Sequence, residues 1–214
     1  MGSVLAVSQS APAPEVVARA ADVARSGGVL VLPTDSVYGL ACAATSGNPA
    51  HGRIFEIKRR ERTQTLPWFV ADPSDLAVYG EGVPAWALRL AEAFWPGALT
   101  LVVRASAAVP AEYAQPGPDG PTIALRVPGS ELCRQLVRAL GTPLAQTSAN
   151  THGAPAATSG HGVEPGIVAS VDLVLDAGPA PVGVASTIVD ATGDVPHVLR
   201  AGAVGESEVL LAAL

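Results

Sequence analysis

Short apolar runs that stop abruptly at turn-forming residues alternate along this chain with segments of helical periodicity, and this order constrains the fold most strongly. The run 29–32 (V-L-V-L) follows two glycines and stops at Pro33, which is typical of a buried strand. Further strands are predicted over 66–71, 99–103, 123–127, 144–146, 173–175, 186–189 and 197–199. Helical spacing predicts helices over 15–26, 49–59, 84–94, 131–140 and 206–214, with a short helix after 72. The mixed order predicts an α/β fold whose sheet is not purely parallel.

The length and composition fit one globular domain over 1–214. The 214 residues are 49% hydrophobic and only 15% charged, which argues against disorder. The 22 glycines and 19 prolines are spread along the chain rather than gathered in a linker. A domain of this size buries enough surface to fold without disulfides or metals.

The sequence also narrows the kind of site and the compartment. Cys42 and Cys133 stand alone in apolar stretches, so we expect buried thiols, and no Cys/His spacing matches a zinc site. The first ten residues lack a basic segment followed by a long apolar one, and no apolar run approaches the roughly 20 residues of a membrane span. We therefore expect a cytoplasmic protein with no membrane association and no metal ligands of its own.

The net charge of −6 argues against a general nucleic-acid surface, since such binding depends on neutralising phosphates. The basic residues are nevertheless concentrated, because Lys58, Arg59, Arg60 and Arg62 lie within five residues. They could form the solvated end of a helix or a phosphate-binding site. The acidic total is compatible with a local anion site and much less so with an extended nucleic-acid track.

Four other polar segments lie at predicted strand ends. They are P-T-D-S-V-Y-G-L at 33–40, T-S-A-N at 147–150, S-T-I-V-D at 186–190 and R-A-G at 200–202. Strand ends that deliver hydroxyls, amides and carboxylates can form a ligand-binding crevice. Ordinary turns use the same residue types, so spacing alone leaves both interpretations open. The segment 151–162 is rich in Gly, Ser, Thr and His, and we predict a flexible loop with solvent-exposed His152 and His161.

In their order and content, these segments resemble the L-threonylcarbamoyladenylate synthase family, whose members have the YrdC-like fold. The run 27–40 resembles the family's opening signature, 58–60 (K-R-R) its K-x-R motif, and 95–100 (W-P-G-A-L-T) its W-P-G-P-L-T. The segments 125–128 (L-R-V-P), 148–150 (S-A-N), 186–190 and 200–202 complete the series. The likeness spans about 27–202 and suggests the short, single-domain form. It implies a twisted, mixed, open sheet with helices packed on it and a concave ligand-binding face.

The resemblance implies a nucleotidyltransferase that uses ATP, bicarbonate and L-threonine, with Mg²⁺ accompanying the triphosphate and no permanently bound cofactor. Threonine and bicarbonate would give a carbamate that attacks the α-phosphate of ATP, so that pyrophosphate leaves and threonylcarbamoyl-AMP forms. The product would pass to a tRNA threonylcarbamoyl-transferase for N6-threonylcarbamoyladenosine modification. Contact between this chain and tRNA itself would be weak or indirect.

The same resemblance assigns residues of this chain to two ligands. The ATP-binding residues would be Lys58, Arg60, Ser148, Asn150, Thr158 and Arg200, of which Lys58 and Arg60 would be catalytic. The amino-acid-binding residues would be Thr34, Arg126, Thr147 and Ser186, with Arg126 gripping the carboxylate.

One segment departs from the family pattern. Where the family commonly continues as P-x-x-[KN]-P-L, residues 61–66 read E-R-T-Q-T-L, and Trp68-Phe69 is bulkier than the aliphatic strand expected. Arg62 could supply the positive charge that Gln64 lacks. Two alternatives follow from this departure and from the fold: a divergent relative that makes another carbamoyl-adenylate, in carbamoyl transfer or specialised metabolism, and a non-catalytic RNA-binding module.

Overall fold

The computed structural model describes residues 3–61 and 65–214. Within them its strands are β1 (Ser3–Ala6), β2 (Leu30–Leu32), β3 (Gly39–Ala43), β4 (Trp68–Phe69), β5 (Gly80–Glu81), β6 (Leu99–Ala105), β7 (Thr122–Arg126), β8 (Leu144–Ser148), β9 (Leu173–Asp176), β10 (Thr187–Asp190) and β11 (His197–Arg200). The helices are α1 (Pro14–Arg25), α2 (Pro49–Lys58), α3 (Asp75–Tyr79), α4 (Ala85–Phe94), α5 (Glu131–Leu140), α6 (Pro165–Ser170) and α7 (Glu206–Ala212), with one 3-10 turn, η1 (Gly160–Gly162). None of these helices has the length and apolarity required to span a bilayer.

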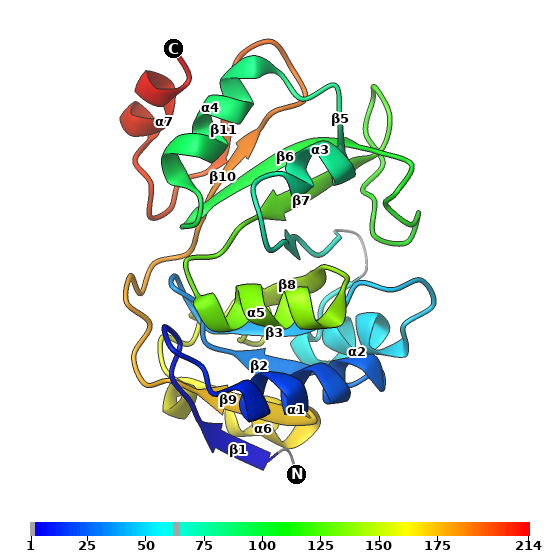
Figure 1. Ribbon diagram of the computed structural model, residues 1–214, viewed down its shortest axis with the longest axis vertical. Helices are drawn as coiled ribbons and strands as arrows, with labels where there is room; N and C mark the ends of the chain where they lie inside the picture. The colour runs from blue at the N-terminus through cyan, green and yellow to red at the C-terminus, as the bar shows by residue number, and fades with distance from the viewer. Residues whose placement is uncertain (1–2, 62–64) are drawn as a thin grey trace.

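The strands form one mixed, open sheet. Their order is β1-β9-β2-β3-β8-β4-β7-β6-β10-β11, and β5 pairs with β6 outside this path. Parallel pairs such as β4–β7 and β6–β10 occur beside antiparallel pairs such as β3–β8 and β6–β7. The prediction of an α/β sheet that is not purely parallel is confirmed. Figure 1 shows β1 close to the N-terminus, with β10 and β11 at the opposite end of the molecule.

Helix ends follow local sequence signals. The Ser130 side chain accepts a hydrogen bond from a first-turn N–H of α5, and Gly141 ends that helix with a φ of 69°. Asn48 caps α2 in the same way as Ser130 caps α5, and α2 ends at Arg59 with a φ of 52°. A left-handed conformation is uncommon for a residue with a Cβ. Arg59 therefore marks a sharp turn of the chain directly after the last residue of α2.

Several elements differ from the sequence prediction. β3 was missed because its first two residues, Gly39 and Leu40, were grouped with the polar segment 33–40. β1, β5 and α6 are too short to give a clear period. The strand predicted over 66–71 is only β4, two residues long. Pro67 has no N–H to donate to a neighbouring strand, so regular pairing starts after it. The remaining predicted helices and strands are present, with ends shifted by a few residues.

The sheet has two faces, and helices α1 and α5 cover part of one of them, here called the first face. On this face Leu30, Leu32, Ala41, Phe69 and Leu144 form an apolar cluster with residues of α1 and α5. Strand side chains alternate between faces, which is why every second residue of β2 and β3 joins this cluster. Figure 1 shows α1 and α5 side by side in front of β2, β3 and β8.

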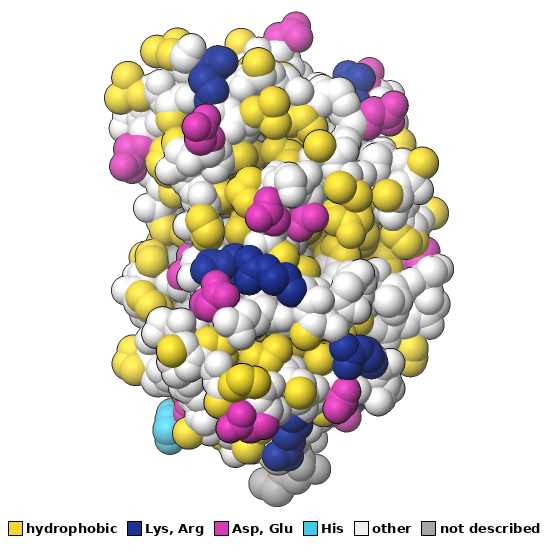
Figure 2. Space-filling model, viewed as in Figure 1, with side chains coloured by type: hydrophobic (Ala, Val, Ile, Leu, Met, Phe, Trp, Pro, Cys, Tyr) yellow, Lys and Arg dark blue, Asp and Glu magenta, His cyan; other side chains and the backbone are white. Residues whose placement is uncertain are grey.

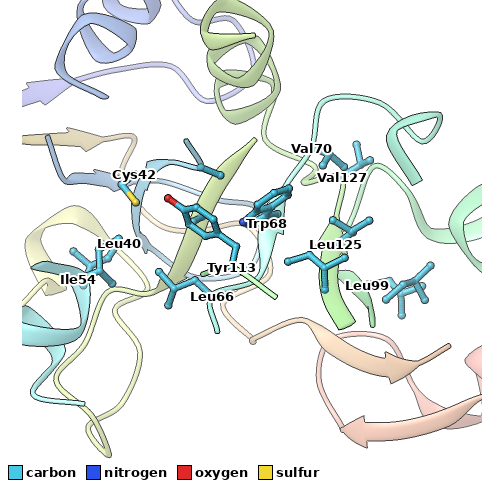
Figure 3. Close-up of a cluster of buried hydrophobic side chains, with 14 of the residues drawn as sticks. Leu40, Cys42, Ile54, Leu66, Trp68, Val70, Leu99, Tyr113, Leu125 and Val127 are labelled. Atoms are coloured by element: carbon cyan, nitrogen blue, oxygen red, sulfur yellow. The ribbon is translucent and has the colours of Figure 1, made fainter. Parts of the chain in front are cut away.

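The opposite face carries the larger core, which continues through both halves of the sheet. Its members run from Leu40 and Ile54 at one end to Leu99 at the other (Figure 3). Trp68 and Tyr113 lie between them, with ring centroids 5.5 Å apart. One apolar cluster therefore joins the strands near the N-terminus to those near the C-terminus. The predicted burial of both cysteines is confirmed.

Beyond β4 the first face of the sheet becomes polar. The strand register places Phe69 beside Arg126, Ala124 beside Val102, and Val102 beside Asp190, so all of these side chains share that face. A cavity of about 700 Å³ lies over this part of the sheet. The face that carries apolar core under α1 and α5 therefore carries a ligand-sized cavity at its other end.

Candidate functional site

The cavity collects most of the residues assigned from the sequence. Seven of the ten line it: Thr34, Arg60, Arg126, Thr147, Ser148, Ser186 and Arg200. Within the part of the chain that the structure describes, the other three, Lys58, Asn150 and Thr158, lie outside this lining. Segments more than 150 residues apart in the sequence thus meet at one site, as the motifs predicted.

Arg126, at the end of β7, is only 2% exposed and is held from several sides. Its Nε donates to the Gly97 carbonyl at 2.8 Å, and Nη1 donates to Ser36 Oγ at 2.8 Å. Nη2 lies 2.7 Å from each carboxylate oxygen of Asp35. Burial lowers the pKa of Arg126, and the charge of Asp35 opposes that shift. Since a guanidinium has five N–H donors, one Nη1 N–H remains for a ligand beyond these four contacts with described residues.

The P-T-D-S segment shapes the partners of Arg126. The Thr34 hydroxyl donates to the Val37 carbonyl at 2.7 Å and accepts from the Ser36 N–H at 3.1 Å. Asp35, besides pairing with Arg126, accepts a hydrogen bond from the Gly129 N–H at 3.0 Å. Thr34 is 1% exposed, and its hydroxyl fixes the turn that presents Ser36 and Asp35.

Ser186 and Arg200 form a second cluster on the same face. Ser186 Oγ lies 2.9 Å from Thr100 Oγ1 and accepts from Arg200 Nη2 at 3.1 Å. Arg200 also donates to the Ser186 carbonyl through Nε and Nη2, at 3.1 and 2.6 Å. Partial burial, and then the positive charge of Arg126, lower the pKa of Arg200. Two guanidinium groups therefore act on the same part of the cavity.

Lys58 is not part of the cavity lining and contacts residues 148–150 at the end of β8. Its Nζ donates to the carbonyls of Ser148 and Asn150 at 2.6 and 2.8 Å, and lies 3.3 Å from Asn150 Oδ1. Burial, and secondly the charge of Arg60, lower its pKa to about 8. Each of the three N–H donors of the ammonium group has an acceptor in 148–150. Lys58 therefore fixes the segment that presents Ser148 to the cavity.

Arg60 enters the cavity from the turn after α2. The left-handed Arg59 reverses the chain, and the Arg60 N–H donates to the Phe55 carbonyl at 2.9 Å. The guanidinium carbon of Arg60 lies 5.1 Å from the centre of the Phe55 ring, and burial lowers its pKa. Of the two basic residues of the K-x-R motif, Arg60 thus lines the cavity, whereas Lys58 binds residues 148–150.

Hydrogen bonds anchor the start of the segment 151–162. The Asn150 amide donates to the carbonyls of Thr151 and Ala154 at 2.9 and 2.6 Å. Glu164, just after the segment, accepts from the N–H and the hydroxyl of Thr151 at 2.7 and 2.6 Å. Asn150 therefore shapes this segment from outside the cavity, and the predicted flexibility of the segment stays a prediction.

The two remaining assigned residues are Thr147, just before this segment, and Thr158, within it. Thr147 is the fourth residue of β8 and lines the cavity. Thr158 is exposed, and its carbonyl accepts from the Ala180 N–H at 2.7 Å. The predicted solvent exposure of His152 and His161 is confirmed.

The cavity also includes polar residues that the sequence assignment missed. Thr100, Ser36 and Asp190 belong to motifs already singled out, but no role was given to them. On β6, Thr100 stands between two apolar residues, and this period-2 pattern could have placed it on the polar face. Gln115 comes from a Pro/Gly-rich loop that gave no signal.

Among the described residues of the segment 61–66, which departs from the family pattern, Thr65 reaches the cavity. Thr65 lines the wall, and its N–H donates to Gln115 Oε1 at 3.2 Å. Arg62 and Gln64 lie outside the described residues. Compensation by Arg62 therefore stays a prediction.

The chemistry of the lining suits an anionic ligand. Arg60, Arg126 and Arg200 supply positive charge, and Asp190 is the one carboxylate in the lining among the described residues. Fixed N–H donors of this kind stabilise negative charge that develops on oxygen. In residues 3–61 and 65–214 no group of three His, Cys, Asp or Glu side chains could hold a metal ion.

The motif order and this geometry agree with a direct comparison of sequences. The family model Sua5_yciO_yrdC, described as "Telomere recombination", matches residues 22–202. The chain belongs to the Sua5/YciO/YrdC family. The matched range contains the motifs at 33–40, 58–60, 147–150 and 200–202, so the predicted family resemblance is confirmed.

Individual members of the Sua5/YciO/YrdC family support the same conclusion. A threonylcarbamoyl-AMP synthase of Pyrococcus abyssi is 37% identical over 190 residues, which are 89% of this chain and 55% of that protein. The structure of Pyrococcus abyssi Sua5 complexed with L-threonine has a TM-score of 0.89 at 33% identity, covering 98% of this chain and 60% of that one. Escherichia coli YciO has a TM-score of 0.87 at 29% identity, covering 98% and 100%. The predicted YrdC-like fold is confirmed, and the chain spans 55% of the length of the first curated relatives it matches.

Proposed function

We propose that this chain is an L-threonylcarbamoyladenylate synthase, which forms threonylcarbamoyl-AMP and pyrophosphate from L-threonine, bicarbonate and ATP. The observation that carries the proposal is the convergence of Arg60, Arg126 and Arg200 with Ser148 and other hydroxyl groups on one cavity. Family relatives named threonylcarbamoyl-AMP synthase, and a Sua5 structure complexed with L-threonine, support the choice of reaction.

The reaction brings two anions together. The amino group of threonine attacks bicarbonate, and loss of water leaves a carbamate. A carbamate oxygen then attacks the α-phosphorus of ATP, the bond to the bridging oxygen breaks, and pyrophosphate leaves with that electron pair. Holding both reactants in line supplies proximity. The guanidinium groups offset charge repulsion and stabilise the charge on the phosphoryl oxygens.

The cavity lining divides between the two ligands. Arg60, Ser148 and Arg200 would bind the triphosphate, while Lys58 and Asn150 would act from outside the lining by holding Ser148 in place. Thr158 is assigned to ATP with no contact that supports it. Mg²⁺ fits as an ion carried by the phosphates, because such an ion keeps most of its ligands from phosphate and water.

The amino acid would lie next to Arg126. Its carboxylate would take the remaining Nη1 N–H, with Ser186 and Thr147 close by in the lining and Thr34 supporting the turn around Ser36. In the cell, we propose a cytoplasmic enzyme that hands its product to a tRNA threonylcarbamoyl-transferase. No part of this assignment requires extensive contact with tRNA.

The test is pyrophosphate release from ATP with bicarbonate and Mg²⁺, comparing L-threonine with the other amino acids and with none. We expect release that requires both L-threonine and bicarbonate, and its loss in Arg126→Gln but not in Arg138→Gln. Arg138 is a matched control because it lies on the exposed side of α5, paired with Glu131. Release with a different amine would place the chain among divergent carbamoyl-adenylate enzymes, and no release under any condition would refute the proposal.

A further inference from the structure

Phe69 lies at the boundary between the apolar and the polar part of the first sheet face. It belongs to the cluster that α5 covers, and it is 1% exposed. In the parallel pair β4–β7 its Cα partner is Arg126, so the two side chains lie next to each other on that face. The guanidinium carbon of Arg126 lies 5.4 Å from the centre of the Phe69 ring. The strand register thus brings the ring and the guanidinium group together.

An aromatic ring supports a guanidinium differently from a carboxylate. The ring face attracts the cation through its quadrupole and uses none of the N–H donors. Asp35 and Ser36, by contrast, each take donors in the guanidinium plane. Phe69 therefore adds support for a buried charge while leaving the in-plane donor available to a ligand.

We propose that Phe69 is a positioning residue for the amino acid, holding Arg126 so that its remaining Nη1 N–H meets the substrate carboxylate. The inference rests on the proposed function for the identity of that carboxylate. It also gives a role to part of the Trp68-Phe69 departure from the family pattern. The two aromatic residues have separate tasks, because Trp68 points to the opposite face and packs near Tyr79 and Tyr113.

Trp68 provides a matched control. It is the neighbouring residue of β4, it is also 1% exposed, and its side chain lies in the core on the other side of the sheet (Figure 3). Trp68→Phe removes buried aromatic volume without touching Arg126. Phe69→Leu removes the ring and keeps an apolar side chain against α5. Any general effect of weakened packing should therefore occur in both variants.

The experiment measures L-threonine binding by calorimetry and pyrophosphate release on the same samples of the full chain. For Phe69→Leu we expect the dissociation constant and KM for L-threonine to rise about threefold to thirtyfold, the range of a buried cation–π contact. The KM for ATP and kcat should stay within about twofold, and Trp68→Phe should leave all of these values near those of the wild type.

The outcomes separate this inference from the proposed function. One outcome is that the wild type binds L-threonine, that Phe69→Leu binds it more weakly, and that neither protein releases pyrophosphate. This outcome would support the role of Phe69 and reject the synthase. Pyrophosphate release with equal L-threonine affinity in Phe69→Leu and Trp68→Phe would overturn the inference and leave the synthase in place. Absence of any L-threonine binding in the wild type would reject both.

Discussion

Lys58 is 3% exposed, and its ammonium group is surrounded by oxygen atoms of residues 148–150. In sequence terms it is a basic residue two positions before Arg60, and both could face phosphates. The structure separates them, because the helix ends between the two and the left-handed Arg59 changes the direction of the chain. A buried charge needs hydrogen-bond partners, and Lys58 finds all of them in the backbone and amide of one turn.

We expect Lys58→Met to weaken ATP binding about tenfold or more and to lower the free energy of unfolding by about 1–3 kcal/mol, since its acceptors lose their donor. The lowered pKa of about 8 adds a test of mechanism. Below about pH 8 the Lys58 ammonium group carries a positive charge and three N–H donors. Above about pH 8 it loses a proton, and with it the charge and one of the donors. Wild-type ATP affinity should therefore fall as pH rises from 7 to 9, whereas that part of the pH dependence should be missing in Lys58→Met.

The matched control for Lys58 is Arg59→Asn. Asn tolerates the left-handed conformation, and Arg59 is exposed, so this change removes a positive charge from the same turn without touching residues 148–150. ATP titrations by calorimetry at several pH values would compare the three proteins. Equal affinity of Lys58→Met and wild type at pH 7 would contradict the role assigned to Lys58.

The residue scale also marks the limit of sequence-based assignment. The family resemblance assigned Arg126, Ser186 and Arg200 to ligands, and the structure places all three in the cavity lining. Side-chain direction was not available from the sequence, so the hydrogen bonds of Lys58 and Thr34 to nearby backbone carbonyls were not foreseen. These directions depend on the path of the turn after each strand or helix, which the sequence does not specify locally.

At the scale of elements, the R-A-G turn shows how backbone packing positions a functional side chain. Gly202 follows β11, and a Cβ at this position would lie 2.4 Å from the Ala185 carbonyl oxygen and 2.6 Å from that of Ser186. The same Ser186 carbonyl accepts two hydrogen bonds from Arg200. Close approach of these two backbone segments therefore fixes Arg200 at the cavity.

We expect Gly202→Ala to lower kcat/KM for ATP at least tenfold, because the added methyl group must push β11 away from Ser186 and displace Arg200. Gly193→Ala is the matched control, since a Cβ at this position would have no atom within 4 Å apart from its own chain neighbours. Steady-state pyrophosphate release measures both variants, with circular dichroism to compare their folding. Wild-type kinetics in Gly202→Ala would show that this approach is not needed to hold Arg200.

Elements also differ in how far their sequences determine them. α5 was predicted at its full length because Ser130 and Gly141 provide a start and a stop signal around a regular apolar period. β4 was overestimated because L-P-W-F-V-A is apolar throughout, while only Trp68–Phe69 pairs with neighbouring strands. Tertiary pairing, and not local preference, sets the length of such a strand.

At the scale of the whole molecule, the charge distribution agrees with a small-molecule enzyme better than with an RNA-binding module. The net charge of the chain is −6, whereas the cavity lining carries three arginines, Arg60, Arg126 and Arg200. On the face shown in Figure 2, basic side chains lie among acidic ones. Over α5, Arg134 and Arg138 share Glu131, so this carboxylate balances one of their two positive charges. Such a surface offers little counterion release to a bound nucleic acid.

The two halves of the sheet meet through the short β4, whose register with β7 comprises only two residue pairs. Few hydrogen bonds therefore connect the two halves of the sheet at this junction, and their association depends on the large apolar cluster on the opposite face. That cluster extends without a break from Leu40 on β3 to Leu99 and Val189 on β6 and β10. The cavity spans the same junction, since Ser148 and Ser186 line it from opposite sides.

We expect the chain to unfold in one cooperative transition, because the shared core prevents either half from opening alone, and we expect ligands to raise its midpoint. ATP and L-threonine, each at about 100 times its dissociation constant, should together stabilise the fold by roughly 5.4 kcal/mol (about 2.7 kcal/mol for each ligand), which is about 11–22 °C for a chain of this size. Differential scanning calorimetry with and without ligands measures both effects, and the ratio of calorimetric to van't Hoff enthalpy tests cooperativity. Arg126→Gln should keep the single transition and lose the part of the shift that L-threonine causes. Two separated transitions, only one of which responds to ligand, would contradict a single domain over 1–214 and would show that the cavity belongs to one half of the sheet.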